Sequence, residues 1–256
     1  MLRDERVEYI IGYLKTHPAA KVSYLSKLLG VSSETIRRDF DYLESSELIN
    51  RVHGGAILNK TNTKEAGFQY RELIYKEEKE EIAKEACKFV EEGDFLAMDV
   101  STTNTELARE LVRNFDKLSV ITNSLTIAMI LSSKDDFSIF LPDGILKNSE
   151  LCIVGPSCVK SVCKHHIDKF FMSISGISAE IGLTDYGYQE YEVKMAMLEN
   201  SSNVFVLADH SKFGNTSMFK VCEGSAVNGI ITDSRADEKM IEDYSLKDIN
   251  IIVGRG

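Results

Sequence analysis

VSSETIRRDF, residues 31–40, is the stretch that decides the fold of the first part of this chain. Ser32 stands where a helix N-cap is expected, because its hydroxyl can accept a hydrogen bond from the first turn. Apolar side chains follow at helical spacing at Ile36, Phe40 and Leu43. The spacing predicts a helix that buries this stripe and exposes the polar residues of its first turns.

The exposed residues of this helix have the side chains that a helix needs in the major groove of DNA. Hydroxyls reach phosphates or base edges, and guanidinium groups bind phosphate or pair bidentately with guanine. The sequence therefore predicts contacts to double-stranded DNA from Ser33, Glu34, Thr35, Arg37 and Arg38. The alternative is that both arginines only form surface ion pairs with the nearby acidic residues Asp39, Asp41 and Glu44.

The neighbouring segments extend this helix into a small domain. Residues 3–16 carry apolar side chains at helical spacing. Ser23 stands where it can cap a short second helix, which Gly30 terminates. Residues 49–58 are typical of two short strands joined by a glycine turn. A helix, a helix-turn-helix and a hairpin in this order predict a winged helix-turn-helix over residues 1–58.

The hairpin, or wing, supplies a second set of candidate DNA contacts. Arg51 and His53 precede two glycines, Gly54 and Gly55, that allow the main chain to approach phosphates closely. We expect Arg51, His53 and Gly54 to lie along the DNA backbone or minor groove, beside the helix that Ser32 is predicted to cap.

The charge distribution agrees with a DNA-binding head and a separate body. The net charge is −10, and residues 1–60 hold nine Lys/Arg and eight Asp/Glu, so the −11 of the remainder lies in residues 61–256. An acidic body is expected to stay off the duplex. The longest apolar runs are strand-sized, and the N-terminus is charged, so we expect a cytoplasmic protein without a membrane partner.

The five cysteines are odd in number and lack the spacing of a disulfide framework or a zinc motif. They predict free thiols and no metal site, and no cofactor is predicted either. The alternative is a metal bound by side chains crowded into one segment: Cys158, Cys163, His165 and His166.

The rest of the chain is typical of an α/β domain. Residues 59–75 form a predicted linker, and residues 76–256 alternate apolar strands with amphipathic helices. This alternation indicates a larger, Rossmann-like, mostly parallel sheet covered on both faces. The predicted strands are 95–100, 118–122, 137–141, 169–174, 204–208, 230–232 and 249–253.

Polar residues follow several of these strands. Ligands of open α/β sheets bind beyond the carboxyl ends of strands, and a helix start with free N–H groups suits a phosphate. The candidate ligand-binding residues are Asp99, Ser101, Thr102, Thr103, Asn104, Thr122, Asn123 and Lys212. The alternatives are that residues 101–104 only cap a helix, that Asn123 is a turn residue and that Lys212 is a solvated loop lysine.

The chain resembles the DeoR/GlpR family of transcription regulators, whose pattern is VSxxTIRRDLxxLexxGxxxRxHGGA. The resemblance is carried by residues 31–40, by Leu43-Glu44 and by RVHGGA at 51–56. The resemblance continues in the body through KEEIA at 79–83, GI at 176–177 and ADHSKFG at 208–214. Three residues depart from the family pattern, since Glu47 and Ser101 stand where glycine is usual and Asp143 replaces the first residue of a glycine pair.

This resemblance implies a repressor of a carbohydrate operon that is not an enzyme. The family's sensor domain resembles sugar-phosphate isomerases and binds a phosphorylated sugar, which loosens DNA binding. Gly176 joins the effector set on this basis, and a homodimer or homotetramer on paired half-sites is implied. One alternative is an isomerase that uses acid/base groups among Asp99, Glu192, Asp209, His210 and Lys212. The other is a DNA-binding module with a purely structural oligomerisation body.

Overall fold

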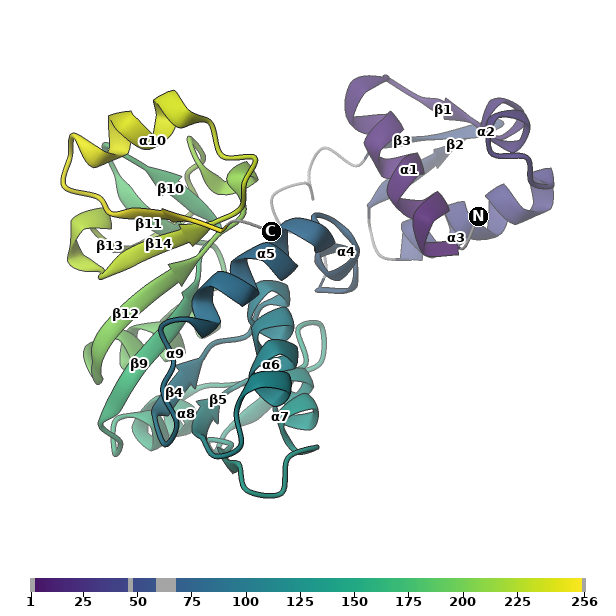
Figure 1. Cartoon of the computed structure of the whole chain (residues 1–256). Helices are drawn as coiled ribbons and strands as arrows, with labels where there is room; N and C mark the ends of the chain where they lie inside the picture. The colour runs from purple at the N-terminus through teal and green to yellow at the C-terminus, as the bar shows by residue number, and fades with distance from the viewer. Residues whose placement is uncertain (1–2, 46–47, 59–67, 255–256) are drawn as a thin grey trace. The chain divides into compact units, whose positions relative to one another are not determined.

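A computed structural model describes residues 3–45, 48–58 and 68–254 of the chain. The chain divides into two compact units, Met1–Ile74 and Tyr75–Gly256, and each is drawn in Figure 1. Glu47, one of the departures from the family pattern, lies outside the described residues, as does most of the predicted linker.

The N-terminal unit is a winged helix-turn-helix, as predicted. A three-stranded antiparallel sheet of order β1-β3-β2 accompanies its helices. The elements in chain order are α1 (Arg3–Thr16), β1 (Ala20–Lys21), α2 (Val22–Leu29), α3 (Ser33–Ser45), β2 (Ile49–Val52), β3 (Gly55–Leu58) and α4 (Phe68–Leu73). Helix α4 falls within the segment for which the sequence predicts a linker.

The start of α2 differs from the prediction. This helix begins at Val22, and Lys21 occupies the N-cap position without a side-chain hydrogen bond. Ser23 lies inside the first turn, so the prediction that it caps the helix was wrong. The strand β1, which pairs with β3, ends at Lys21, and the helix begins at the next residue, Val22, earlier in the chain than predicted. Gly30 ends α2 in the left-handed region at φ 65°, as predicted.

A buried ion pair fastens α1 to α3. The Arg6 Nε lies 2.8 Å and the Nη2 lies 3.0 Å from the two carboxylate oxygens of Asp39. Asp39 is only 1% exposed, on the same side of α3 as the fully buried Ile36, Phe40 and Leu43. The packing therefore fixes which face of α3 points outward.

The C-terminal unit is built on a seven-stranded parallel sheet of order β15-β14-β12-β9-β4-β5-β6, which confirms the predicted fold class. Its strands are β4 (Phe95–Met98), β5 (Ser119–Thr122), β6 (Ser138–Phe140), β9 (Ile167–Ser173), β12 (Ser201–Leu207), β14 (Gly229–Thr232) and β15 (Ile251–Val253). Each of the seven predicted strands corresponds to one of these.

Helices cover both faces of this sheet (Figure 1). Neighbouring strand residues point to opposite faces, so Phe170 joins one core and Phe171 the other. On the Phe171 face lie α5 (Lys76–Cys87), α6 (Thr102–Asn114) and α7 (Leu125–Leu131). On the Phe170 face lie α8 (Pro156–Val162), α9 (Tyr188–Glu199) and α10 (Glu238–Ser245).

Short antiparallel strands that the sequence did not predict complete the unit. Two of them form a hairpin, β7 (Ile145–Lys147) and β8 (Cys152–Val154). Three form a separate sheet, β10 (Gly176–Ser178), β11 (Gly182–Asp185) and β13 (Phe219–Cys222). The single-turn 3-10 helices η1 (His210–Lys212) and η2 (Gly224–Ala226) follow β12 and β13.

The strand order creates a switch point at the carboxyl edge of the sheet. From β4 the chain adds β5 and β6 on one side, and then returns to add β9, β12, β14 and β15 on the other. The order therefore reverses between β4 and β9, and open α/β sheets bind ligands beyond the carboxyl ends of strands at such a switch point. Asp99 and Ser173 stand at the carboxyl ends of these two strands.

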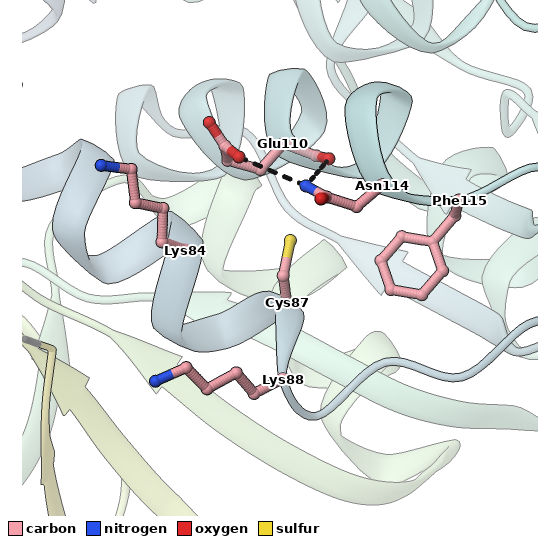
Figure 2. A pocket seen from close by; sticks show the side chains of 6 residues that line it. All are labelled: Lys84, Cys87, Lys88, Glu110, Asn114 and Phe115. Atoms are coloured by element: carbon pink, nitrogen blue, oxygen red, sulfur yellow. Dashed lines mark hydrogen bonds between the residues drawn. The ribbon is translucent and has the colours of Figure 1, made fainter. Parts of the chain in front are cut away.

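A hollow of about 280 Å³ lies between the last turns of α5 and α6 (Figure 2). The helices run opposite to the strands, so this hollow lies towards the amino ends of the sheet, away from the switch point. Its cysteine, Cys87, is kept as a neutral thiol because burial, assisted by the charge of Glu110, raises its pKa to about 12. The lining residues are Lys84, Cys87, Lys88, Glu110, Asn114 and Phe115.

Candidate functional site

The predicted recognition helix α3 exposes its charged residues and buries its apolar stripe. Ser32 caps it as predicted, since its Oγ accepts a hydrogen bond of 3.0 Å from the Thr35 backbone N–H. The Thr35 hydroxyl lies 2.9 Å from the same oxygen. The side chains of Glu34, Arg37 and Arg38 are 61%, 56% and 78% exposed. Ser33 begins the helix and is half-buried.

The two arginines are held only loosely. Arg37 Nη1 and Arg38 Nε lie 3.7 Å and 3.6 Å from the carboxylate of Glu34, one turn back on the same exposed face. Exposed pairs at this separation contribute little, so a phosphate or a guanine can replace Glu34 as the partner. The alternative partner Asp39 is instead paired with Arg6, and Asp41 with Arg51.

The wing residues have different roles. Arg51 is tied to α3, because its guanidinium pairs with Asp41 and its backbone N–H donates 3.0 Å to Glu44 Oε1. His53 is exposed at the hairpin tip. Gly54 has a φ of 75°, a conformation that favours glycine, and its carbonyl accepts a bond from Val22 N–H. His53 and Gly54 thus lie at the exposed tip of the hairpin, while the Arg51 side chain, which is 33% exposed, is paired with α3.

In the C-terminal unit, α6 starts at the switch point. Ser101 is its N-cap and accepts a 2.9 Å bond from the Asn104 N–H, so its hydroxyl oxygen serves as a cap. Within the described residues, the backbone N–H groups of Thr102 and Thr103 have no hydrogen-bond partner. These two donors at a 13-residue helix start can receive an anion. Both residues are nearly buried, at 6% and 7% exposure.

A buried charge network lies directly behind this helix start. Lys194 of α9 places its Nζ 2.7 Å from Asp99 Oδ2 and 2.6 Å from Asp185 Oδ2. Asp99 also accepts bonds from the side chain of Asn104 and from the N–H and hydroxyl of Ser173. Although burial acts in the opposite direction, the two carboxylates raise the pKa of Lys194, which therefore stays charged.

Two of the predicted ligand residues belong to this network. Asp99 is 3% exposed and its two oxygens already accept four hydrogen bonds or ion-pair contacts. Asn104 is fully buried, and its Nδ2 also lies 2.9 Å from the Phe171 carbonyl. Both side chains hold the start of α6 against the ends of β4 and β9.

Thr122 and Asn123 end the neighbouring strand β5 and are also buried. Asn123 Oδ1 accepts 3.0 Å from Val100 N–H, and its Nδ2 donates 3.2 Å to the Ile153 carbonyl. Thr122 Oγ1 accepts 3.1 Å from the Ser124 N–H. These contacts favour the structural alternative for Asn123, because both ends of its amide bind the backbone.

Gly176 and Lys212 lie on the other side of the switch point. Gly176 begins β10 and is buried, and a Cβ there would meet the Asn215 carbonyl oxygen at 2.6 Å. Lys212 ends η1, with its Nζ 3.6 Å from Asp209 Oδ2 and 27% of its side chain exposed. Lys212 is thus the partly exposed cation of this edge among the predicted effector residues.

Sequence reasoning missed Lys194, Asp185 and Ser173. Burial of a lysine cannot be read directly from the sequence. A signal was present, however, because Lys194 follows Val193 on the face of α9 that also holds the buried residues Ala196 and Met197. A lysine on such a stripe requires a buried counter-charge. Among the described side chains, no group of three His, Cys, Asp or Glu residues is placed to hold a metal ion.

Comparison with known families agrees with this two-part architecture. A family model described as a DeoR-like helix-turn-helix domain matches residues 6–62. A second, described as the DeoR C terminal sensor domain, matches residues 75–234. The chain belongs to the DeoR family of transcriptional regulators. The two matches cover the unit that contains α3 and the unit that contains the switch point.

The DeoR-family relatives include regulators and repressors that match along almost their whole length. An uncharacterised HTH-type transcriptional regulator of Bacillus subtilis, YulB, is 35% identical over 96% of both chains. The transcriptional repressor GlcR of the same organism is 32% identical, over 99% of this chain and 97% of that protein. The glycerol-3-phosphate regulon repressor of Escherichia coli is 33% identical, over 91% and 92%.

Among solved structures, ribose 5 phosphate isomerase A of Neisseria gonorrhoeae matches 53% of this chain and 52% of that chain, with 14% identity and a TM-score of 0.40. Similarity at this level says nothing about activity. The matched relatives are named as regulators or repressors, which indicates a DNA-binding regulator rather than an enzyme. Of the helices that the structure describes, none has the length and apolar character needed to span a bilayer.

Proposed function

We propose that this DeoR-family protein represses an operon of carbohydrate metabolism and is released from its operator by a phosphorylated sugar. The observation that carries the DNA-binding half is the outward face of α3. Arg37 and Arg38 are more than half exposed on it, while Ile36 and Phe40 on the opposite side are fully buried. The helix can therefore present two guanidinium groups to a duplex without disturbing its own packing.

The effector half rests on the carboxyl edge of the parallel sheet. The N–H groups of Thr102 and Thr103 follow β4, and Lys212 follows β12, two strands away. Strands lie about 4.8 Å apart, so this span is roughly 10 Å, which a sugar phosphate can bridge. Two kinds of donor, helix N–H groups and an ammonium, thus surround one small ligand.

The network leaves Lys194 unavailable to a phosphate. Its Nζ already lies 2.7 Å from Asp99 Oδ2 and 2.6 Å from Asp185 Oδ2 in the interior. We therefore place the phosphate at the N–H groups of α6 or at Lys212. The sugar hydroxyls then face the polar groups at the switch point.

One relative is named as the repressor of a glycerol-3-phosphate regulon, so a repressor of genes for a small phosphorylated metabolite is among the relatives. We also propose that two or more copies bind paired half-sites, which is the usual arrangement of helix-turn-helix proteins on DNA.

The test is an operator-release assay with the full-length protein. A duplex selected from a random library is titrated by fluorescence anisotropy, alone and with glucose 6-phosphate, fructose 6-phosphate, fructose 1-phosphate or glycerol 3-phosphate. We expect at least one of these four phosphorylated compounds to weaken the operator complex about tenfold or more. The Lys212→Ala variant should bind the operator normally but respond less to that effector. Turnover of a sugar phosphate by the purified protein would instead favour an enzyme.

A further inference from the structure

We propose that two copies of this chain meet through one edge of the sensor unit, where β6, the hairpin of β7 and β8, and α7 expose apolar side chains. This inference rests on the proposed function, because paired half-sites require two DNA-binding units in one assembly. The surface, the β6–β7 edge, includes none of the predicted DNA-binding or effector-binding residues. It consists of Met129, Phe140, Leu141, Ile145, Leu146 and Leu151.

The exposed apolar side chains of the sensor unit are concentrated on this edge. Among the described residues of the unit, ten large apolar side chains are exposed, and six of them lie between residues 129 and 151. Their exposed fractions range from 41% to 76%. Single exposed apolar side chains are common on protein surfaces, whereas a group of this kind indicates contact with another molecule.

The elements that carry these side chains are in contact with one another. The turn from β6 to β7 stays against the body, because a Cβ on Gly144 would lie 2.6 Å from the Val154 carbonyl oxygen. Strand β7 pairs antiparallel with β8. The carbonyl of Leu151, just before β8, accepts a 2.9 Å bond from the Leu125 N–H at the start of α7. Met129 follows Leu125 by four residues, so it lies on the same side of this helix.

Both β6 and β7 have one side that no described strand covers. Strand β6 ends the seven-stranded sheet and pairs only with β5, and β7 pairs only with β8. The N–H and C=O groups on the outer side of such strands can pair with a further strand. A two-fold axis beside β6 sets this strand antiparallel to its own copy, which is an arrangement that strand pairing allows.

The charge distribution favours a second copy as the partner. Residues 61–256 carry a net charge of −11, so two sensor units repel each other over most of their surfaces. Residues 118–133, which include the whole of α7, contain no Lys, Arg, Asp or Glu. Lys147 of β7 is neutralised by Glu190, whose Oε1 lies 2.7 Å from its Nζ. A two-fold interface brings the same surface of two copies together, so a surface with little charge avoids contact between like charges.

The exposed apolar area of the β6–β7 edge agrees with what a stable interface needs. A whole large side chain presents roughly 150–200 Å², so the six partly exposed side chains offer on the order of 500 Å². A standard interface covers about 800 Å² of each partner, and rather more than half of that area is apolar. The edge of one copy therefore supplies the apolar part of one side of such an interface.

The experiment compares Ile145→Asp with wild type in the full chain by sedimentation velocity over a range of protein concentrations. Ile145 is 68% exposed, so the substitution changes the surface, and in a two-fold assembly it introduces one carboxylate from each copy. We expect the wild type to sediment as a dimer or a larger assembly. Ile145→Asp should sediment at half that mass, with association weakened at least about a hundredfold. Leu246→Asp, which replaces an exposed leucine after α10 and outside the edge, is the matched control and should keep the wild-type mass.

A second measurement uses the unaltered protein, so it does not depend on a variant that folds. Hydrogen exchange followed by mass spectrometry should show slower amide exchange over residues 138–146 in the assembled protein than in protein diluted until it dissociates. An Ile145→Asp variant with the wild-type mass, or exchange over 138–146 that does not change on dissociation, would overturn the inference and leave the proposed function intact, because the copies would then meet elsewhere. A wild type that stays monomeric both free and on its operator, with the edge covered by another segment or another protein, would overturn the inference together with the proposed use of paired half-sites.

Discussion

Replacement of Lys194 by methionine is expected to destabilise the sensor unit strongly. The side chain is 1% exposed, and its Nζ lies 2.7 Å and 2.6 Å from carboxylate oxygens of Asp99 and Asp185. Methionine fills similar space but leaves two buried carboxylates without their cation. Loss of one partner from a buried ion pair costs about 3–5 kcal/mol. In a unit of this size each kcal/mol shifts Tm by about 2–4 °C, so we expect Tm to fall by at least about 6 °C.

The pH dependence of this loss gives a more specific signature. In the wild type, burial is outweighed by Lys194 and by bonds from Ser175 and Tyr186, so the pKa of Asp185 is lowered on folding. A carboxyl group with a lowered pKa stabilises the fold at neutral pH and loses that contribution as the pH falls through the folded pKa. Without Lys194, burial dominates at Asp185 as it already does at Asp99, so Asp185 gains a proton on folding and the deficit should shrink from about pH 7 to about pH 5.

The assay is thermal unfolding of the full-length protein by circular dichroism at both pH values. Lys160→Met, on the exposed side of α8, removes a lysine without a buried partner and serves as the matched control. A Lys194→Met variant that melts within about 1 °C of the control at both pH values would refute the reasoning, because the charge network would then contribute nothing to stability.

Three further predictions concern the DNA-binding unit. Arg38→Ala should weaken operator binding by about 10–100-fold in anisotropy titrations without a change in Tm, and unchanged affinity would remove Arg38 from the contact set. Arg6→Met leaves the carboxylate of Asp39 buried without this ion pair, so the free energy of unfolding measured by circular dichroism should fall by about 3 kcal/mol, the lower end of the cost of breaking a buried pair. A variant that melts like the wild type would contradict this. Gly55→Ala places a Cβ 2.4 Å from the Ala20 carbonyl oxygen, and this clash should cost about 1–3 kcal/mol, which the same melt detects or excludes.

The sheet of the sensor unit could be predicted because each of its strands is a short apolar run between helical segments. What escaped prediction are the short strands outside this sheet. The strand β1 is two residues long, too short for any alternation to show. The strands β10 and β11 are three and four residues long. Their pairing depends on the return of the chain from β9, a tertiary arrangement that a local pattern does not contain.

The candidate sites were predictable to different degrees. On α3 the helical spacing places the apolar residues on one face and the polar residues on the other, so the sequence predicts the outward face. At the sheet edge the sequence identifies Asp99 and Asn123 as polar residues that follow strands. It does not identify the groups that form hydrogen bonds and ion pairs with their side chains. Lys194 reaches Asp99 from a helix 95 positions along the chain, and only the fold brings them together.

The central claim is that this protein reads a specific duplex through α3 and releases it when a sugar phosphate binds. The most direct measurement is the Kd of the full-length protein for its selected operator and for a scrambled duplex of equal length, each with and without the sugar phosphate, at one fixed salt concentration. We predict that the operator is bound about a thousandfold more tightly or better, and that the sugar phosphate reduces this preference at least tenfold. Equal affinity for the two duplexes, or a preference that no sugar phosphate changes, would contradict the account.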